Sequence, residues 1–430
     1  MFRKELATPA ILFTLGMSVC AINLLNFTSV WNVQLHRNTF LLVSGGCLFL
    51  ILGSYFQNVC RIKKNNAIGL IHRKEFVPLR IIALKTLLFF QIAISTLRIY
   101  FLTQFYGMGS LAENLFAHTL AIKTDPDSAI HFPLGIGFLV GITEMMGYVL
   151  AFLLSVYLRL GKKYKKHIFW LAINFIVCLF TSLLSSGRTS LLHMIVTFGV
   201  FYLLSLWYLK KKISVKLILE WSLIGLIFLA SFQQIGFLIG RDNTTDETAT
   251  YVTGVYCGAQ LQNLDDYINE PYTYRPEYFG ELTFHNIYNF LDTDFNLLEI
   301  DINMRDYHLF NFRKGYPLGN VASAFQEYYM DFGIFGTYII CFLIGWIMQS
   351  LYSKMKTNGD LSTGVISITT YIFAMIIPSM FMSFFAESFF LKIAELINYR
   401  FWIGYVFLFV LIYWKIPWNI HTTHNNTIKK

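Results

Sequence analysis

An arginine in a short turn between two apolar stretches is the first residue that could do chemistry. Arg188 lies in the segment SSGRTS, Ser185–Ser190, where glycine and serine leave backbone N–H groups accessible beside the guanidinium. A guanidinium is a planar fork of donors that fits phosphate oxygens. The pattern therefore indicates an anion site, and the alternative is that Arg188 anchors the chain at lipid headgroups.

Further arginines lie in the long polar segment that follows residue 240. Between Arg241 and Lys314 the chain has 13 acidic and 5 basic residues, a net charge of −8. We expect a subset of these arginines to bind a diphosphate, while acidic and aromatic side chains contact sugars. The candidates are Arg241, Arg275, Arg305 and Arg313.

A second group of polar residues lies in GYPLGNVASAFQEYYMDFGIFG, Gly315–Gly336. On a helix Asn320, Ser323, Glu327 and Asp331 would follow one another at intervals of three or four residues and form one polar stripe. A carboxylate at the edge of a bilayer is costly unless it is paired or functional. We expect Glu327 or Asp331 to be a general base, and the alternative is that both pair with loop arginines.

Other titratable side chains have two interpretations each. His285 and His308 could be bases near neutral pH, or they could be ordinary solvated histidines. Arg98 and Glu144 lie at similar depths in two apolar stretches, which favours a structural ion pair, with a proton or substrate pathway as the alternative. The sequence has no Walker A, GxSxG or HExxH motif and no His/Cys ligand cluster, so we expect neither a metal nor a cofactor.

Membrane helices must position these residues. The 430 residues are 55% apolar and 14% charged, against about 25% charged in soluble domains. Apolar runs of roughly 20 residues recur along the chain, which predicts an all-α polytopic membrane protein and excludes a soluble enzyme or a β-barrel. The ten predicted spans are at about residues 9–27, 39–57, 81–105, 133–158, 167–184, 189–209, 217–240, 332–352, 362–385 and 400–415.

Basic clusters at the ends of alternate spans predict that both termini are cytoplasmic. The chain then divides into spans 1 to 7 (residues 1–240), a large extracytoplasmic loop (241–331), and spans 8 to 10 with a short cytoplasmic tail (332–430). Helical spacing of apolar residues from Val252 to Ile268 predicts one amphipathic helix that lies on the membrane or caps a cavity. A second interfacial helix is expected within 107–131.

The ten spans, the SGR turn, the single large outer loop and the motif at its exit resemble the bacterial oligosaccharide repeat-unit polymerases, also called O-antigen or capsular polysaccharide polymerases. Such proteins often show a GN-x-Y/S-x-F…Y-x-DFG-x-x-G stretch at this place. Two loop segments, Tyr256–Pro271 and Tyr278–Leu291, are also similar to that family. The exit motif here reads Gly319, Asn320, Ser323, Phe325, Tyr329, Asp331, Phe332, Gly333 and Gly336.

The resemblance implies that repeat units carried on undecaprenyl diphosphate are joined at the outer face of the bacterial cytoplasmic membrane. It implies membrane lipids, a flippase and a chain-length regulator as partners, and no nucleic acid. The catalytic candidates are Arg188, Arg241, Glu327, Asp331, His285 and His308. The candidates for binding substrate are Arg275, Arg305, Asn320 and Tyr328.

Three alternatives stay open at this point. An O-antigen ligase shares the large outer loop and its arginines but transfers finished glycan to another acceptor. A flippase or other transporter would place its charges within the membrane and have short loops. A non-catalytic membrane scaffold is the third alternative.

Overall fold

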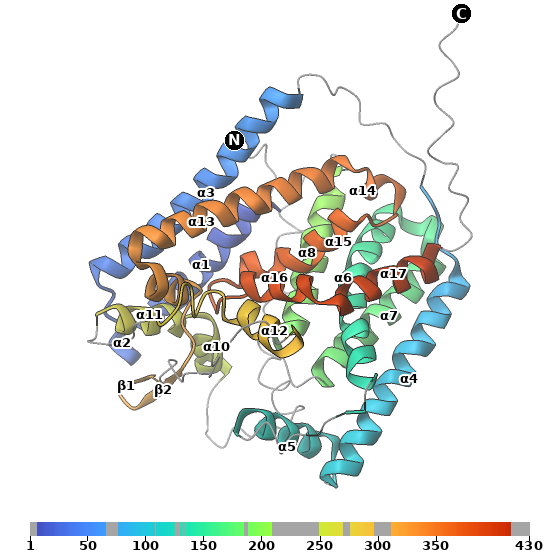
Figure 1. Cartoon of the computed structure of the whole chain (residues 1–430), viewed down its shortest axis with the longest axis horizontal. Helices are drawn as coiled ribbons and strands as arrows, with labels where there is room; N and C mark the ends of the chain where they lie inside the picture. Colours follow the sequence, from blue (N-terminus) through green and yellow to red (C-terminus); the bar gives the residue numbers. More distant parts are fainter. Residues whose placement is uncertain are drawn as a thin grey trace, which may run out of the picture.

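The computed structural model describes residues 7–65, 76–107, 109–124, 130, 132–133, 135–184, 188–208, 249–269, 276–295 and 311–413. These residues form helices and one short antiparallel β-hairpin (Figure 1), so the prediction of a mostly helical chain is confirmed. The elements are α1 (Pro9–Leu25), α2 (Thr28–Trp31), α3 (Arg37–Asn65), α4 (Ile81–Tyr106), α5 (Leu111–Thr124), α6 (Ile136–Leu160), η2 (Gly161–Tyr164), α7 (Lys165–Leu184), α8 (Arg188–Tyr208), α10 (Ala249–Cys257), α11 (Ala259–Asn269), α12 (His285–Phe295), β1 (Asn311–Arg313), β2 (Tyr316–Gly319), α13 (Phe325–Thr357), α14 (Asp360–Thr363), α15 (Ile368–Met382), α16 (Phe389–Ile397) and α17 (Tyr399–Tyr413).

Five stretches of the described chain are long and apolar enough to cross a membrane. One of them contains both α6 and α7, which are joined by η2 and pack against each other. The apolar helices α1 and α15 are shorter, with 17 and 15 residues, and α16 meets the next helix at a bend of 72°. The predicted count of ten spans is therefore not confirmed, and the predicted span at 217–240 lies outside the described residues. The five stretches are Arg37–Arg61, Ile81–Tyr106, Ile136–Leu184, Thr189–Tyr208 and Phe325–Thr357.

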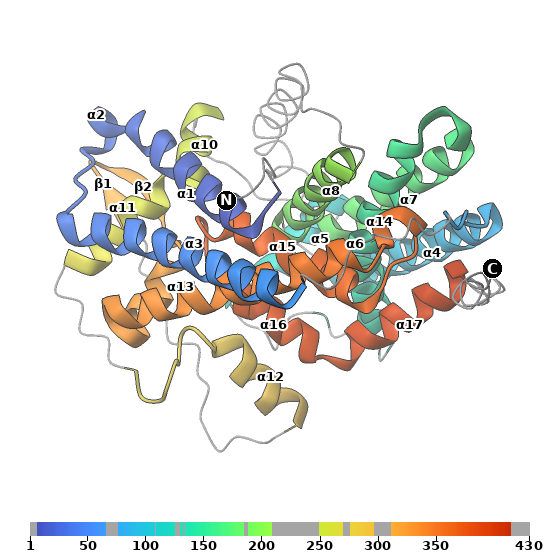
Figure 2. The same ribbon diagram turned by 90° about the horizontal axis from the view of Figure 1, so that it is seen from above.

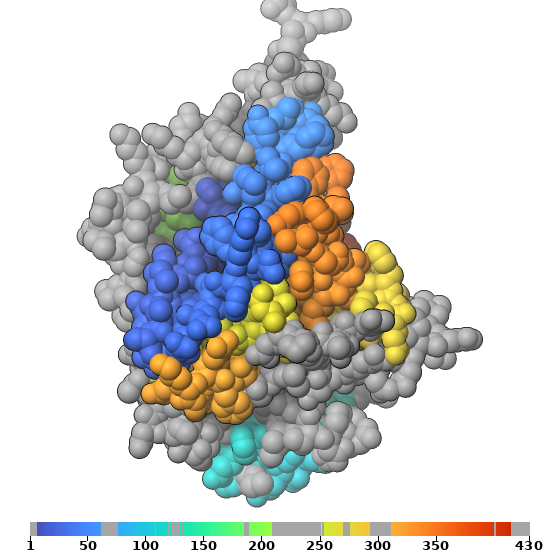
Figure 3. All heavy atoms as spheres, turned by 90° about the vertical axis from the view of Figure 1, so that its left-hand side faces the viewer, coloured from blue at the N-terminus to red at the C-terminus, as the bar shows by residue number. Residues whose placement is uncertain are grey.

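Helices α3 and α13 lie side by side, as Figures 1 and 3 show. Glycines make this contact close. A Cβ atom at Gly53 would lie 2.0 Å from the carbonyl oxygen of Phe342, and one at Gly345 would lie 2.1 Å from that of Leu50. Small residues let membrane helices approach backbone to backbone and gain dispersion energy. The position of α13 beyond its break at Gly333 is therefore set by α3.

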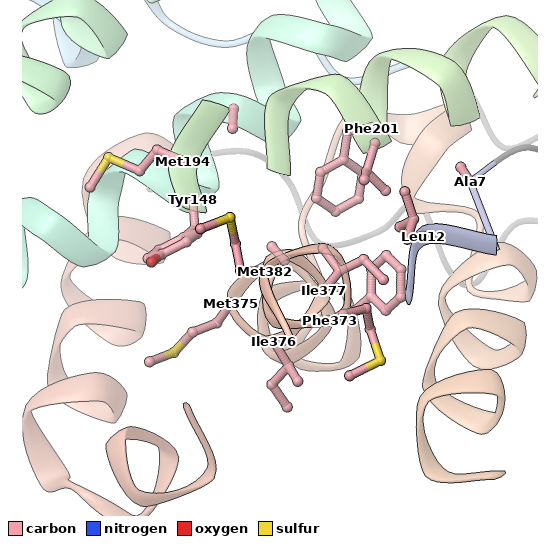
Figure 4. Close-up of a cluster of buried hydrophobic side chains, with 14 of the residues drawn as sticks. Ala7, Leu12, Tyr148, Met194, Phe201, Phe373, Met375, Ile376, Ile377 and Met382 are labelled. Atoms are coloured by element: carbon pink, nitrogen blue, oxygen red, sulfur yellow. The ribbon is translucent and has the colours of Figure 1, made fainter. Parts of the chain in front are cut away.

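The centre of the bundle is α6, which packs against α4, α7, α8, α15 and α17. All of its residues from Met146 to Tyr157 are buried, as expected for a helix that is apolar on every side. Figure 4 shows Tyr148 of α6 beside Met194 of α8 and Met382 of α15. This core connects the helices that come before the large loop with those that follow it.

Helix ends that the sequence predicts on one side of the membrane meet at one end of the bundle. The backbone N–H of Val77 donates to the carbonyl of Thr363 at 2.8 Å. The backbone N–H of Leu79 donates to the hydroxyl of Tyr157 at 2.6 Å. The segment before α4 is thus joined to the last turn of α6 and to α14, which follows α13.

Polar side chains inside the bundle bind backbone carbonyls of neighbouring helices. Pro378 in α15 has no N–H, which removes the helical partner of the Ala374 carbonyl. Thr197 of α8 shares its hydroxyl hydrogen between that carbonyl, at 3.0 Å, and the carbonyl of His193, at 2.8 Å. Backbone groups in hydrocarbon need such partners, so Thr197 compensates for the proline.

The region predicted as one amphipathic helix contains two helices, α10 and α11, which meet at Gly258. The break occurs where the chain crosses α1: a Cβ atom at Gly258 would lie 3.1 Å from the backbone nitrogen of Leu24. Residues 259–266 of α11 are all buried, so this helix lies inside the protein and not on a membrane surface. The segment predicted to hold a second interfacial helix contains the helix α5.

Helix α11 lies near the start of α3 (Figure 2), and two adjacent carboxylates on α11 hold the segments around it. Asp265 accepts hydrogen bonds from the backbone and the ring of His36, both at 2.7 Å. Asp266 binds the guanidinium of Arg313 and accepts a hydrogen bond from Asn311 at 2.5 Å, which holds the hairpin. Arg313, expected among the anion-binding arginines, therefore has a structural partner.

A double-mutant cycle tests the role of Thr197. Thr197→Val should lower the free energy of unfolding by about 1–3 kcal/mol, because the Ala374 carbonyl is left without a partner. In a Pro378→Ala background the alanine N–H can bind that carbonyl, so the same change should cost much less. The measurement is unfolding of the detergent-solubilised protein.

The matched control for this cycle is Thr86→Val. Thr86 is exposed and bonds only within its own helix among the described residues, at 3.0 Å to Ile82. Its replacement should change stability by less than about 0.5 kcal/mol. Equal costs of Thr197→Val in both backgrounds would show that the hydroxyl does not compensate for Pro378.

Candidate functional site

The structure describes the side chains of half of the predicted site residues. Arg188 is the first residue of α8, and its side chain lies outside the described part of the structure. The other predicted residues outside the described chain are Arg241, Arg275, Arg305 and His308. The side chains that can be placed are those of His285, Asn320, Glu327, Tyr328 and Asp331.

The predicted polar stripe from Asn320 to Asp331 does not form. Helix α13 begins at Phe325, so Asn320 and Ser323 lie in the non-helical segment that follows β2. Asn320 is exposed, whereas Ser323 is fully buried. The helical spacing fails because the N–H of Ala324 donates to the carbonyl of Ser383, at 2.9 Å, and fixes the chain there before the helix starts.

Asp331 holds the turn that precedes α12. Its carboxylate accepts hydrogen bonds from the backbone N–H groups of Leu282, at 3.1 Å, and Thr283, at 2.7 Å. Charge-assisted bonds of this kind position a loop firmly. This geometry favours a structural role for Asp331 over the predicted role as a general base.

Glu327 has different surroundings. Its side chain is 6% exposed, and its Oε2 atom has no hydrogen-bond partner among the described residues. A buried polar group without a partner costs about 1–3 kcal/mol. Such a group calls for an explanation, and a binding or catalytic role is one. Of the two predicted carboxylates, Glu327 is therefore the one that is free to bind a ligand or accept a proton.

Tyr328, predicted to bind substrate, is buried instead. Its side chain is 1% exposed, its ring packs against Phe390, and its hydroxyl donates to Glu387 at 3.4 Å. Glu387 in turn accepts a hydrogen bond from the backbone N–H of Phe390, at 2.7 Å, in the first turn of α16. Tyr328 thus connects α13 to α16 and cannot stack on a sugar from this position.

His285 is the first residue of α12 and is half-buried. Burial lowers the pKa of its imidazole, and the nearby Glu281 carboxylate opposes this effect. The preceding residue, Phe284, packs against Phe390 of α16 with ring centres 4.8 Å apart. His285 therefore lies near the α13–α16 junction and remains a candidate base.

A second group of charges lies within the helices at the same end of the bundle. Arg98 and Glu144, predicted as an ion pair, lie within electrostatic reach of each other. Lys392 donates to both carboxylate oxygens of Glu395 at 2.8 Å, and its ammonium lies 5.7 Å from the ring centre of Tyr148. Buried charges are tolerated in membranes when they pair in this way.

Sequence analysis assigned no role to Glu387, Lys392, Glu395 or His193. His193 is 1% exposed, lies in the field of Lys392, and its Nε2 atom has no partner among the described residues. The sequence feature that could have indicated this pair is the spacing of Lys392 and Glu395. They are three residues apart in the segment between two predicted spans, and this spacing favours an ion pair on a helix. Their contact with α6 depends on long-range packing and had no signal in the sequence.

The described residues contain no group of three or more His, Cys, Asp or Glu side chains that could hold a metal ion. The six cysteines are free thiols, and most of them are buried. The chemistry that this site can do with its described side chains is proton transfer and hydrogen bonding.

The pH dependence of stability should depend on Glu387, which lies between α15 and α16. Burial raises the pKa of its carboxyl from 4.5 to about 7. Its contribution to stability is then fully present below pH 4.5 and is lost as the pH rises through 7, because the folded state holds the proton more tightly. In Glu387→Gln the stability should fall much less as the pH rises, because the amide does not titrate. The measurement is thermal unfolding of the solubilised protein from about pH 4 to about pH 8.

The control is Glu113→Gln at the exposed start of α5, which should keep the wild-type dependence. A Glu387→Gln variant whose stability falls as steeply as that of the wild type would mean that another group carries the effect.

No protein-family model, curated protein or solved structure matches this chain. The resemblance to the oligosaccharide repeat-unit polymerases therefore depends on the motifs of the sequence and on their order.

Proposed function

We propose that the chain is a polymerase that joins oligosaccharide repeat units carried on undecaprenyl diphosphate. It would act at the outer face of a bacterial cytoplasmic membrane, with both termini in the cytoplasm. The observation that carries the proposal is the buried, unpartnered carboxylate oxygen of Glu327 at the start of α13. This residue lies within the motif on which the family resemblance depends.

The reaction needs a base and a group that stabilises the leaving diphosphate. A hydroxyl of the incoming repeat unit attacks the anomeric carbon of the growing glycan, and the bond from that carbon to the lipid diphosphate breaks. Glu327 Oε2 takes the proton of the attacking hydroxyl. Arg188, Arg241, Arg275 and Arg305 are the proposed donors to the departing diphosphate.

Glu327 is preferred to Asp331 because of their hydrogen bonds. Asp331 already accepts two backbone N–H groups, which stabilise its charged form and hold it in place. Glu327 Oε2 has no such partner among the described residues, so it can approach a substrate hydroxyl. His285 and His308 are the alternative bases.

An O-antigen ligase would use the same kind of donor and is the nearest alternative. A transporter is favoured by a different observation, the charges that pair inside the bundle. Lys392 with Glu395, and Arg98 near Glu144, lie in segments that a transporter could use to move a proton or an anion. The two classes differ in what a cell accumulates when the protein is lost.

Deletion of the gene in its host, followed by analysis of surface glycan length, tests the proposal. Loss of a polymerase leaves single repeat units attached to the final acceptor. Loss of a ligase leaves no attached glycan, and loss of a flippase leaves lipid-linked units inside the cell. We expect the first pattern, and either of the other two would replace the proposed function with the corresponding alternative.

The second test complements the deletion with Glu327→Gln. The amide keeps the shape of the side chain but cannot accept a proton, so chain extension should slow by about 10²- to 10⁴-fold at normal protein level. Asp331→Asn is the comparison: it weakens the acceptor for the 282–283 turn and should reduce the amount of folded protein instead. Full-length glycan made by well-expressed Glu327→Gln would exclude Glu327 as the base and move that role to His285 or His308.

A further inference from the structure

We propose that the turn leading into α13, formed by Ser323, Gln326 and Glu327, is a binding site for the hydroxyl groups of a carbohydrate. We call these three residues the Ser323 turn. The proposal rests on the proposed function in one respect, that the carbohydrate is the glycan of the lipid-linked unit. It goes further in naming Ser323 and Gln326 as residues that bind the glycan and in describing what they recognise.

The first argument is the concentration of unpartnered polar atoms. Ser323, Gln326 and Glu327 are 0%, 1% and 6% exposed. Four of their atoms have no hydrogen-bond partner within the part of the chain that the structure describes. The four atoms are Ser323 Oγ, Gln326 Nε2, Gln326 Oε1 and Glu327 Oε2. Folded proteins rarely leave such atoms unsatisfied, and four within five residues indicate a ligand.

The second argument is the chemistry of these atoms. Gln326 offers one donor and one acceptor group, Ser323 can donate and accept, and Glu327 accepts when ionised. Sugar hydroxyls also donate and accept, so they can satisfy the whole set. A lipid diphosphate offers mainly acceptor oxygens, so it has few hydrogens to donate to the acceptor atoms of Gln326 and Glu327. The Ser323 turn is therefore suited to the sugar and not to the diphosphate.

The third argument is that the backbone of the turn is fixed. The N–H of Ala324 donates to the carbonyl of Ser383, and the N–H of Gln326 donates to that of Ser323, both at 2.9 Å. Between them, the ring of Phe325 packs against α3 so closely that a Cβ atom at Gly46 would lie 2.2 Å from it. Polar groups on a rigid support can be held in a binding geometry before the ligand arrives.

An apolar surface lies at the same end of α13. The ring of Phe279 is 74% exposed and lies 5.1 Å from that of Phe332, centre to centre. Pyranose rings have apolar C–H faces that pack on aromatic rings, while their hydroxyls point to polar groups. Phe279 is therefore the proposed apolar contact for a sugar bound at the Ser323 turn.

Thermal unfolding of the ligand-free, full-length protein in detergent gives the first test. Gln326→Leu removes two unsatisfied polar atoms at nearly constant volume, so the melting temperature should rise by roughly 1 to 3 °C. The matched control is Gln349→Leu on the same helix, whose amide donates to Asn58 at 3.0 Å and should lower the melting temperature. A fall for Gln326→Leu as large as that for Gln349→Leu would overturn the proposal, since the amide would then have structural partners.

Equilibrium binding in nanodiscs gives the second test. The probes are lipid-linked repeat units extracted from a strain that lacks this gene, and undecaprenyl diphosphate without sugars. Gln326→Leu should bind the glycan-bearing lipid about 10-fold more weakly and the bare lipid diphosphate unchanged, the expected result for one lost hydrogen bond to the glycan. Unchanged binding of both probes, or equal weakening of both, would overturn the proposal.

This test is separate from that of the proposed function. A deletion strain with the phenotype of a ligase, together with Gln326-dependent binding, would reject the polymerase and keep the Ser323 turn as a glycan site. A polymerase phenotype together with Gln326-independent binding would keep the polymerase and reject the Ser323 turn as a glycan site.

Discussion

Every polar group buried among apolar helices needs a partner, and this requirement explains most of the architecture. Side chains meet it by binding the backbone of another helix, as Thr197 does for the carbonyl that Pro378 leaves free and as Asn174 does for the carbonyl of Leu84. Each of these bonds also fixes how two helices lie against each other. The places where the requirement is not met within the described chain, above all the Ser323 turn, are therefore the places to look for function.

The charged residues obey the same rule. Asp265 and Asp266 are buried in α11, where hydrogen bonds from His36 and Asn311 and the guanidinium of Arg313 satisfy their oxygens and hold the large loop at the start of α3. Lys392 and Glu395 compensate each other inside the bundle. Ion pairs of this kind stabilise little in net terms, but removing one partner is costly, so they fix one arrangement of the loop over the helices.

The sequence predicted the features that depend on local composition. Apolar runs of span length appear as helices such as α3, α4 and α13, because burial of the backbone in hydrocarbon leaves few alternatives. Predictions that depended on long-range packing failed. The predicted helix from Val252 to Ile268 breaks at Gly258, where the chain crosses α1. The predicted polar stripe does not form, because the bond from Ala324 to Ser383 fixes the chain before the helix begins. The sequence identified Glu327 as a candidate from its residue type and its depth. That Asp331 is hydrogen-bonded and Glu327 Oε2 is not could be seen only in the structure, because the partners of Asp331 lie in a turn some 50 residues away along the chain.

Gly333, the glycine of the DFG sequence, explains how the first two turns of α13 can differ in direction from the rest of the helix and still be rigid. Gly333 interrupts α13 with φ 64° and ψ −170°, a conformation that residues with a Cβ rarely adopt. The carbonyl of Gly333 is bound by the hydroxyl of Thr337 at 2.8 Å, so the break leaves it satisfied. The two turns before the break can then take their direction from α15, α16 and the 282–283 turn, while the rest of α13 follows α3. The residues that carry the proposed chemistry are thus oriented by α15, α16 and the 282–283 turn and anchored by the long helix α13, which one straight helix could not do.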